Sequence, residues 1–171
     1  MNPPPAGDLP PSITRPPRAK LVIGRSDVAD FPRLGLAEVP VKVDTGAYTS
    51  SIHCHRVVEH AATDAAPARL TFELLDPEHP QFADRPMSTT DFERKSVRSS
   101  NGETEERYVI RTRIRLFGRD LPLELTLAER GDMRFPVLLG RKLLAGRFVV
   151  DPALADLSLT QKRAARPSDA P

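Results

Sequence analysis

Alternation of apolar and polar side chains, repeated in several segments, is the feature that most restricts what this chain can fold into. Residues 108–116 read YVIRTRIRL, so every second side chain from Tyr108 to Leu116 shares one face, while Val109 and three arginines share the other. Comparable strand-like runs occupy residues 20–25, 37–44, 68–76 and 121–129. A period of two in this many segments predicts half-buried antiparallel strands.

Helical patterns are scarce. The one candidate is residues 140–146, GRKLLAG, which end at a glycine. Residues 77–93 are rich in Pro, Asp and Ser and predict a long irregular connection. Asn101 and Gly102 form a strong hairpin-turn signal between two strand-like flanks. We therefore predict an all-β fold, a barrel or a sandwich, with one short helix near its C-terminal end.

The two ends of the chain differ from its centre. Residues 1–18 hold seven prolines and almost no large apolar side chain, so they cannot bury enough surface to offset the entropy lost on ordering. We expect residues 1–18 and 161–171 to be disordered tails and residues 19–160 to form one domain. A chain of 171 residues has room for a single core of ordinary size.

Charge and cysteine content exclude several classes of function. The formal net charge is only +2, which argues against a nucleic-acid binder with a concentrated basic surface. No apolar run is long enough to span a membrane, and the N-terminus has no apolar segment typical of a secretory signal. Cys54 is the single cysteine, which fits a reducing compartment. We expect a cytoplasmic protein without a membrane partner.

A second constraint is the stretch VKVDTGAYTSSIH, residues 41–53, which places Asp44 directly after an alternating apolar strand. Asp, Thr and Gly are common in turns, so one reading is an ordinary turn. The alternative is that the strand serves to position a carboxylate. About 90 residues later, FPVLLGRKLL (135–144) is an apolar run that ends at Gly140 and leads into the predicted helix.

Together these two stretches resemble the retropepsin-type aspartic proteases, which combine a D-[ST]-G-A loop with a hydrophobic-hydrophobic-Gly-Arg turn before a helix. The matching residues are 44–47, DTGA, and 138–141, LLGR. The chain is still more similar to a bacterial branch labelled ATP-dependent zinc protease, through VDTGAYTSSIH, SVRSSNGETEERYVI and ELTLAERGDMRFPVLLGRKLLAGRFVVDP. The resemblance covers most of residues 20–152 and implies a retropepsin-like closed β-barrel.

The resemblance also implies a mechanism. Aspartic proteases cleave peptides with water activated by two carboxylates that share one proton, because two like charges about 3 Å apart cannot both ionise. This chain has one D-[ST]-G motif, so the second carboxylate is expected from Asp44 of a second copy. Thr45 would hydrogen-bond between the two loops, and Gly46 would allow close backbone approach.

Substrate contacts follow from the same resemblance. Ala47 is expected to line the substrate site beside the catalytic loop. The Asn101-Gly102 hairpin is expected to be a flap over the substrate, although it lacks the glycine-rich tip usual in viral relatives. The 138–140 segment would pack behind the loop as its support.

Zinc in the family label calls for an independent test on the residues. H-E-x-x-H is absent, and the one clustered candidate is His53-Cys54-His55. On a strand His53 and His55 share a face, while a third ligand such as His60 or Glu59 would have to fold back. We favour a surface or core histidine pair over a metal site and expect no metal and no cofactor.

The sequence does not support ATP binding, because no G-x-x-x-x-G-K-[ST] motif is present. Arg111, Arg113 and Arg115 form a basic strand face that we expect to be solvated. Cys54 is a poor candidate nucleophile, since the histidines next to it on a strand face away from it.

The sequence thus favours an aspartic-type peptide or isopeptide hydrolase that works as a homodimer on a peptide or protein substrate. Two alternatives remain: a zinc-dependent peptidase, as the family label says, and an inactive retropepsin-like binding module. Similar proteins resemble partners of ATP-grasp ligases that add amino-acid tails, which suggests a functional link to such a ligase.

Overall fold

The computed structural model describes residues 19–82, 84–98, 102, 104–129 and 134–165. The N-terminal tail expected over residues 1–18 lies outside this range. The strands are β1 Leu21–Ile23, β2 Ser26–Phe31, β3 Leu36–Val43, β4 Ser50–His60, β5 Arg69–Leu74, β6 Met87–Thr89, β7 Phe92–Arg98, β8 Thr104–Leu116, β9 Arg119–Ala128, β10 Val137–Leu139 and β11 Phe148–Val150. The helical segments are η1 Pro32–Leu34, α1 Arg141–Leu144 and α2 Leu157–Ala164.

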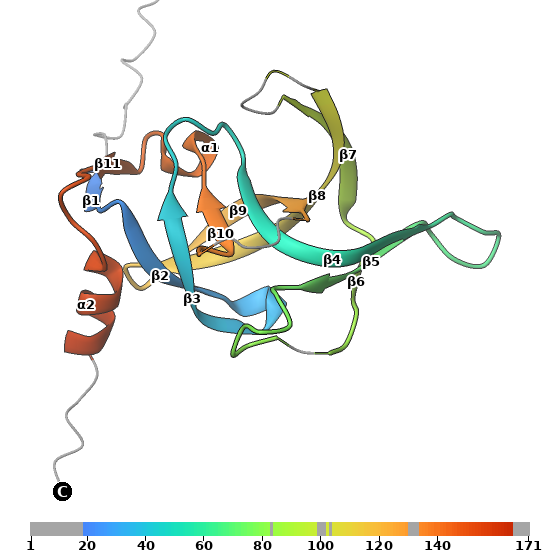
Figure 1. Ribbon diagram of the computed structural model, residues 1–171, viewed down its shortest axis with the longest axis horizontal. Coiled ribbons are helices and arrows are strands. Elements are labelled where there is room, and N and C mark those ends of the chain that lie inside the picture. The colour runs from blue at the N-terminus through green and yellow to red at the C-terminus, as the bar shows by residue number, and fades with distance from the viewer. Residues whose placement is uncertain (1–18, 83, 99–101, 103, 130–133, 166–171) are drawn as a thin grey trace, which may run out of the picture.

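Six strands form a closed barrel, which confirms the all-β prediction and selects the barrel over the sandwich. Their order is β10-β3-β2-β8-β9-β4, and β10 also pairs with β4, so the sheet closes on itself. The barrel extends from β4 through β5 to β6, while β7 pairs with β8. β1 and β11 form a separate two-stranded sheet (Figure 1).

The predicted inner faces are buried. Val39 and Val41 of β3 are fully buried, and Lys42 between Val41 and Val43 is exposed. β5, β8 and β9 likewise direct their alternate apolar side chains into one core. Burial of these faces supplies the main favourable free energy of such a fold.

Strand direction departs in part from the prediction. Hairpin neighbours are antiparallel, as expected, but β3 with β10, β4 with β9 and β1 with β11 are parallel. Alternation reports which face of a strand is buried and carries no information about the direction of its neighbour. The parallel pairs join segments that are distant in the sequence.

The C-terminal part holds more helix than expected. The candidate over 140–146 is a single turn, α1, and the longer helix α2 continues to Ala164. The ordered chain therefore extends beyond residue 160, where we expected the domain to end. Residues 166–171 of the predicted tail lie outside the described range. No helix in the described ranges combines the length and apolarity needed to cross a bilayer.

A buried carboxylate fastens α2 to the barrel. Asp27 of β2 is 1% exposed and accepts hydrogen bonds from the backbone N–H groups of Ser158 (2.8 Å) and Leu159 (3.1 Å). It caps these N–H groups in place of a local N-cap side chain, because Asp156 makes no such bond. Burial raises the pKa of Asp27 and outweighs these backbone hydrogen bonds, which lower it.

The irregular connection predicted over 77–93 is only partly irregular. It contains β6 and the start of β7, and β6 pairs with β5. The arginines of the β8 outer face are exposed or half-buried, in agreement with the expected outer face, and they form ion pairs there. Arg111 pairs with Asp91, and Arg115 pairs with Asp120.

Candidate functional site

The loop of residues 44–47, the DTGA loop, begins where β3 ends. The backbone N–H of Asp44 donates to the Leu139 carbonyl at 3.0 Å. The Asp44 carboxylate Oδ1 accepts hydrogen bonds from the N–H groups of Gly46 (3.0 Å) and Ala47 (3.2 Å). Asp44 is half-buried, and Thr45 and Gly46 are exposed. The loop thus presents a carboxylate whose orientation is set by backbone donors.

Strand β10 holds both sides of this loop. Val137 pairs with Val41 of β3, which enters the loop, and also with Ile52 of β4, which leaves it. The two strands that flank Asp44 are therefore joined through a strand that lies about 90 residues later in the chain. This arrangement fixes the base of the loop against the closed barrel.

Gly140 lies against the backbone that follows the loop. A Cβ at this position would lie 2.5 Å from the Thr49 carbonyl oxygen and 2.8 Å from that of Tyr48. The Gly140 N–H donates to the buried hydroxyl of Ser50 at 3.0 Å. Only glycine fits here without a shift of the backbone. The 138–140 segment thus packs against the loop region as we expected.

Arg141 supports the loop from the other side. Its guanidinium donates to the carbonyls of Thr45 (2.8 Å) and Gly46 (2.9 Å), and its backbone N–H donates to the Ala47 carbonyl (2.9 Å). The side chain also lies over the Tyr48 ring, 6.0 Å from its centroid. One residue therefore satisfies three loop carbonyls. The local sequence LLGR is explained by this function in support of the loop.

The hairpin of β7 and β8 is the proposed flap. Its strands pair antiparallel from Phe92 with Ile110 to Arg98 with Thr104. Asn101, at the predicted turn, lies outside the described residues. Gly102 is exposed and has a φ of 89°, a backbone conformation that favours glycine.

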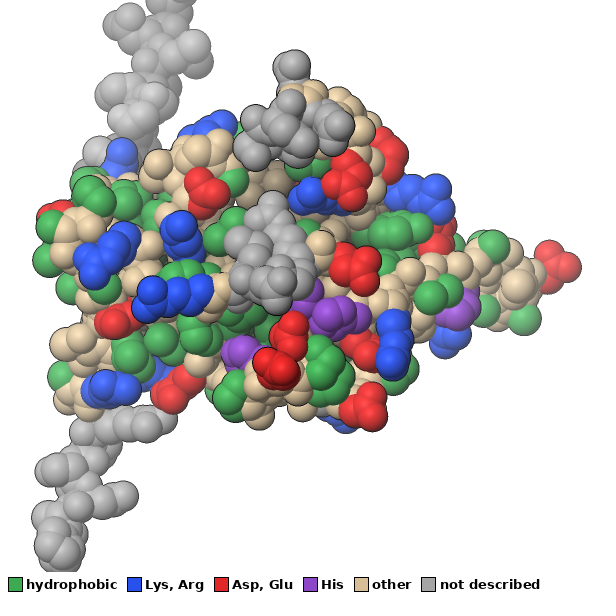
Figure 2. Space-filling view, viewed as in Figure 1, with side chains coloured by type: hydrophobic (Ala, Val, Ile, Leu, Met, Phe, Trp, Pro, Cys, Tyr) green, Lys and Arg blue, Asp and Glu red, His purple; other side chains and the backbone are tan. Residues whose placement is uncertain are grey.

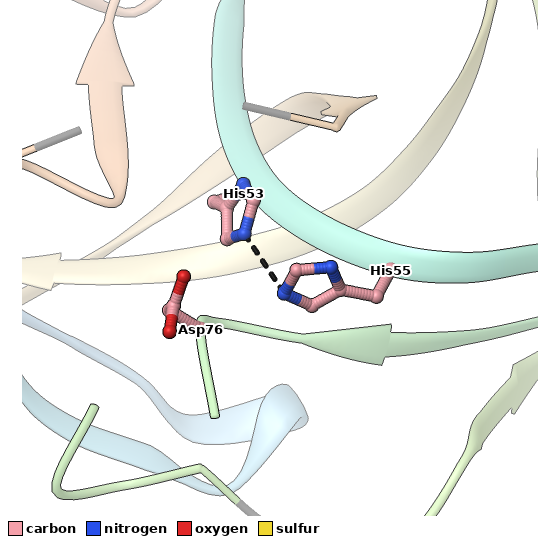
Figure 3. A group of neighbouring side chains, drawn as sticks. All are labelled: His53, His55 and Asp76. Carbon is pink, nitrogen blue, oxygen red and sulfur yellow. Dashed lines mark hydrogen bonds between the residues drawn. The ribbon is translucent and has the colours of Figure 1, made fainter. Parts of the chain in front are cut away.

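A second cluster lies further along β4. The Nε2 atoms of His53 and His55 are 2.9 Å apart, and the rings meet edge to face (Figure 3). The Asp76 carboxylate joins them from the end of β5, and the ligand atoms of the three side chains lie within 4.8 Å of one another. We refer to these residues as the His-Asp cluster. The sequence predicted the shared face of the histidines but missed Asp76.

The third ligands suggested by the sequence are engaged elsewhere. His60 hydrogen-bonds to the Thr71 hydroxyl at 3.0 Å, and Glu59 accepts hydrogen bonds from Arg94 and Tyr108. Asp76 carries a signal that could have been used, because, like Asp44, it is an acid that follows an apolar strand almost directly.

Burial shifts the pKa values of two neighbouring side chains on β4. Burial and the neighbouring His55 lower the pKa of His53, while Asp76 and Glu129 act in the opposite direction. Burial raises the pKa of the Cys54 thiol to about 12. At that pKa almost no thiolate forms at neutral pH, so Cys54 is not an activated nucleophile.

A hollow of about 470 Å³ adjoins the His-Asp cluster. Its lining includes His55 and the carboxylates of Glu73, Asp84 and Glu129, against the single cation Arg56. Arg56 is already paired with Glu73 at 3.0 Å. Figure 2 shows histidine and acidic side chains side by side near the middle of one face.

Three comparisons relate the chain to known proteins. Residues 22–161 match the model of a family described as RimB-like, retropepsin-like aspartic endopeptidase RimB. A protein named probable alpha-L-glutamate ligase from Parasynechococcus marenigrum (strain WH8102) is 36% identical over 137 residues, which cover 78% of this chain and 28% of that protein. A protein of the same name from Shewanella pealeana is 35% identical over 134 residues, 78% of this chain and 29% of the relative.

The chain thus spans less than a third of the length of these curated relatives. Among solved structures, the Legionella pneumophila protein Lpg0085, of unknown function, superposes with a TM-score of 0.61 at 22% identity. The match covers 82% of this chain and 99% of that one. At this identity the likeness shows a shared fold.

Proposed function

Because the chain belongs to the RimB-like family of retropepsin-like aspartic endopeptidases, we propose that it hydrolyses peptide or isopeptide bonds with two Asp44 carboxylates, one from each copy of a homodimer. The observation that carries this proposal is the DTGA loop. Its carboxylate is held by backbone donors on a support that Gly140 and Arg141 keep in close contact.

The need for a second copy follows from the surroundings of Asp44. Within the part of the chain that the structure describes, the hydrogen bonds of this carboxylate go to backbone N–H groups and to no second acid. One ionised carboxylate can take a proton from water, but it cannot at the same time donate one to the substrate carbonyl. Two carboxylates that share a proton do both.

Exposed apolar side chains support a dimer. Tyr48, next to the DTGA loop, is 63% exposed. Val22 and Val149 are partners in the β1–β11 sheet and are 45% and 53% exposed, so they form one apolar patch. Residues 145–147 link α1 to this sheet, and Figure 1 shows the sheet, α1 and the loop after β3 along one edge of the barrel. Such a surface suits a second copy of the chain.

The proposed reaction requires only water. One Asp44 carboxylate removes a proton from a water molecule as the water oxygen bonds to the scissile carbonyl carbon. The other carboxyl group protonates the carbonyl oxygen. The resulting tetrahedral diol collapses when the carboxyl group that gained the water proton donates it to the leaving nitrogen, the other carboxylate removes a proton from a diol hydroxyl, and the C–N bond breaks. The products are a carboxylic acid and an amine, with the shared proton restored.

The names of the relatives suggest a substrate. They carry the matching region in chains named as alpha-L-glutamate ligases. We therefore propose that candidate substrates include amino-acid tails, above all glutamate tails, that an ATP-grasp ligase adds. Cleavage of such a tail would remove the residues that the ligase adds.

The test is Asp44→Asn, which keeps the shape of the side chain but removes the base. Hydrolysis of glutamate-tailed peptides should fall at least about a thousandfold while the melting temperature changes little. In a tandem-linked dimer, the Asp44→Asn substitution in one copy alone should abolish activity as fully as in both. Half-activity in that single-copy variant would refute the shared dyad.

Three further measurements separate the alternatives. The dyad predicts activity that tolerates EDTA and a bell-shaped pH profile, because one carboxyl group must be protonated while the other is ionised. A zinc peptidase predicts loss with chelator and survival of Asp44→Asn. A binding module predicts no turnover under any condition. A protein that stays monomeric at high concentration with peptide present would also contradict the proposal.

A further inference from the structure

The His-Asp cluster has the composition of a metal site. Two imidazole nitrogens and one carboxylate oxygen are ligands that Zn²⁺ and its neighbours in the first transition series prefer. In a tetrahedral Zn²⁺ site with Zn–N bonds of about 2.0 Å, two such nitrogens lie roughly 3.3 Å apart. The Nε2 atoms of His53 and His55 are 2.9 Å apart and share a hydrogen bond, and this distance is also close to the spacing of two ligand nitrogens.

A left-handed turn of the backbone at Leu75 brings Asp76 to the two histidines. Leu75, between β5 and Asp76, is fully buried and has a φ of 70°, a left-handed conformation that branched side chains rarely adopt. Its N–H donates to the His53 carbonyl at 3.0 Å. This turn directs Asp76 back toward β4 and is maintained at a conformational cost, which is a common feature of functional sites.

The surroundings favour a cation. One oxygen of Asp76 accepts the Glu78 N–H at 3.0 Å, which orients the carboxylate. In the adjoining hollow, Arg56 is paired with Glu73, while Asp84 and Glu129 add two further carboxylates. The local excess of negative charge attracts a divalent ion and offers it a path from solvent.

We propose that His53, His55 and Asp76 together bind one divalent transition-metal ion of the Zn²⁺ class, which fastens the Asp76 turn to β4. None of these residues belongs to the DTGA loop, so the ion is structural and takes no part in the Asp44 chemistry. The proposal goes beyond the hydrolase function and stands whether or not that function is correct. Water completes the coordination from the hollow.

Metal binding is measured directly on the full chain. After chelator treatment and dialysis, Co²⁺ is titrated and followed by its visible absorption bands, and Zn²⁺ is titrated by calorimetry and by displacement of Co²⁺. We expect one ion per chain and a rise in melting temperature with Zn²⁺. Absence of saturable binding of either ion would overturn the proposal.

Variants identify the ligands. His55→Ala and Asp76→Asn should each weaken binding by at least about tenfold and remove the Zn²⁺-dependent rise in melting temperature. His60→Ala is the matched control, since His60 lies on the same strand but bonds to Thr71. Circular dichroism checks that each variant is folded, and Asp76→Asn preserves the side-chain shape if His55→Ala does not fold. Binding that is unchanged in both folded ligand variants, or lost equally in His60→Ala, would refute the site.

Discussion

The DTGA loop and the His-Asp cluster both depend on β4, yet they are built in opposite ways. The loop precedes the first residue of the strand and is shaped by backbone hydrogen bonds and by the close approach of Gly140. The cluster consists of two side chains on β4 itself and of Asp76, which lies in the turn that follows β5. Backbone contacts can set the geometry of the first without any ligand. The second brings donor atoms together and gains most from a cation between them.

Among the changes that leave the proposed catalytic side chain in place, Gly140→Ala has the largest expected effect, and it acts on the loop. The new Cβ would lie 2.5 Å from the Thr49 carbonyl, so the backbone beside Asp44 must move. We expect peptide hydrolysis to fall about a hundredfold and the free energy of unfolding to fall by about 2–3 kcal/mol. Both are measured by steady-state kinetics and urea denaturation.

Metal affinity of the same variant tests whether the two regions are separable. It should stay within about twofold of the unmodified chain, because additivity holds for sites that share no partner. Gly35→Ala is a control, since its Cβ would meet no atom within 4 Å and only the φ of 66° is strained. Loss of metal binding in Gly140→Ala would show that the two regions are coupled.

Chelation perturbs the His-Asp cluster and leaves the DTGA loop unchanged. Removing the proposed ion should lower the free energy of unfolding by about 2.7 kcal/mol relative to metal at a hundred times its Kd. Hydrolysis at 25 °C should not change, because the proposed Asp44 dyad uses no metal. Thermal melts and initial rates in EDTA, with and without added Zn²⁺, provide the comparison. A rate that falls with the melting temperature and recovers with Zn²⁺ would contradict this separation.

Ser50→Ala removes one hydrogen bond that supports the DTGA loop and keeps the shape of the loop. Ser50 is 2% exposed, and its hydroxyl accepts the Gly140 N–H. The unpaired N–H should cost about 2 kcal/mol of stability, measured by urea denaturation. Ser88→Ala, at an exposed position on β6, should cost almost nothing. Equal stability of the two variants would show that this hydrogen bond contributes little to the support.

The smallest effect concerns Asp30 of β2, which belongs to neither region. Burial by itself would raise the pKa of Asp30, but the Glu38 N–H and Lys162 outweigh it and hold that pKa below its ordinary value. A depressed folded-state pKa stabilises the protein above the unfolded pKa of about 4, and this stabilisation is lost as the pH falls through the folded value. Asp30→Asn should therefore cost about 0.5–1 kcal/mol at pH 7 and progressively less below pH 4.

Denaturation at pH 7, 4 and 3 measures that difference, and the Co²⁺ affinity and the hydrolysis rate of the variant should match those of the unmodified chain. A gap in stability that widens as the pH falls would show that the sign is wrong.

The barrel was predictable because most of its strands bury one face and expose the other. β4 was not predicted as a strand, because its first five residues are all buried. The alternation of apolar and polar side chains disappears where both faces of a strand are covered. β2 does alternate, but Asp27 occupies a core position, where a carboxylate is unexpected until α2 supplies its donors. For the same reason α2 was missed, since its anchor lies 131 residues away in the sequence.

The two candidate sites also differ in how far the sequence predicted them. The DTGA loop is contiguous, so its residues and their supporting LLGR segment are visible as motifs. Asp76 reaches the histidines only through the β4–β5 pairing and the left-handed turn at Leu75. Neither is encoded in a short pattern, and so the sequence indicated a histidine pair without a third ligand.

The position of β10 has a consequence for biosynthesis. A ribosome completes β3, the DTGA loop and β4 long before it reaches Val137, and until then the two flanking strands lack the segment that joins them. Contacts between residues so far apart in the sequence form late and slowly. A nascent chain therefore cannot complete the support of the DTGA loop until nearly the whole barrel has emerged.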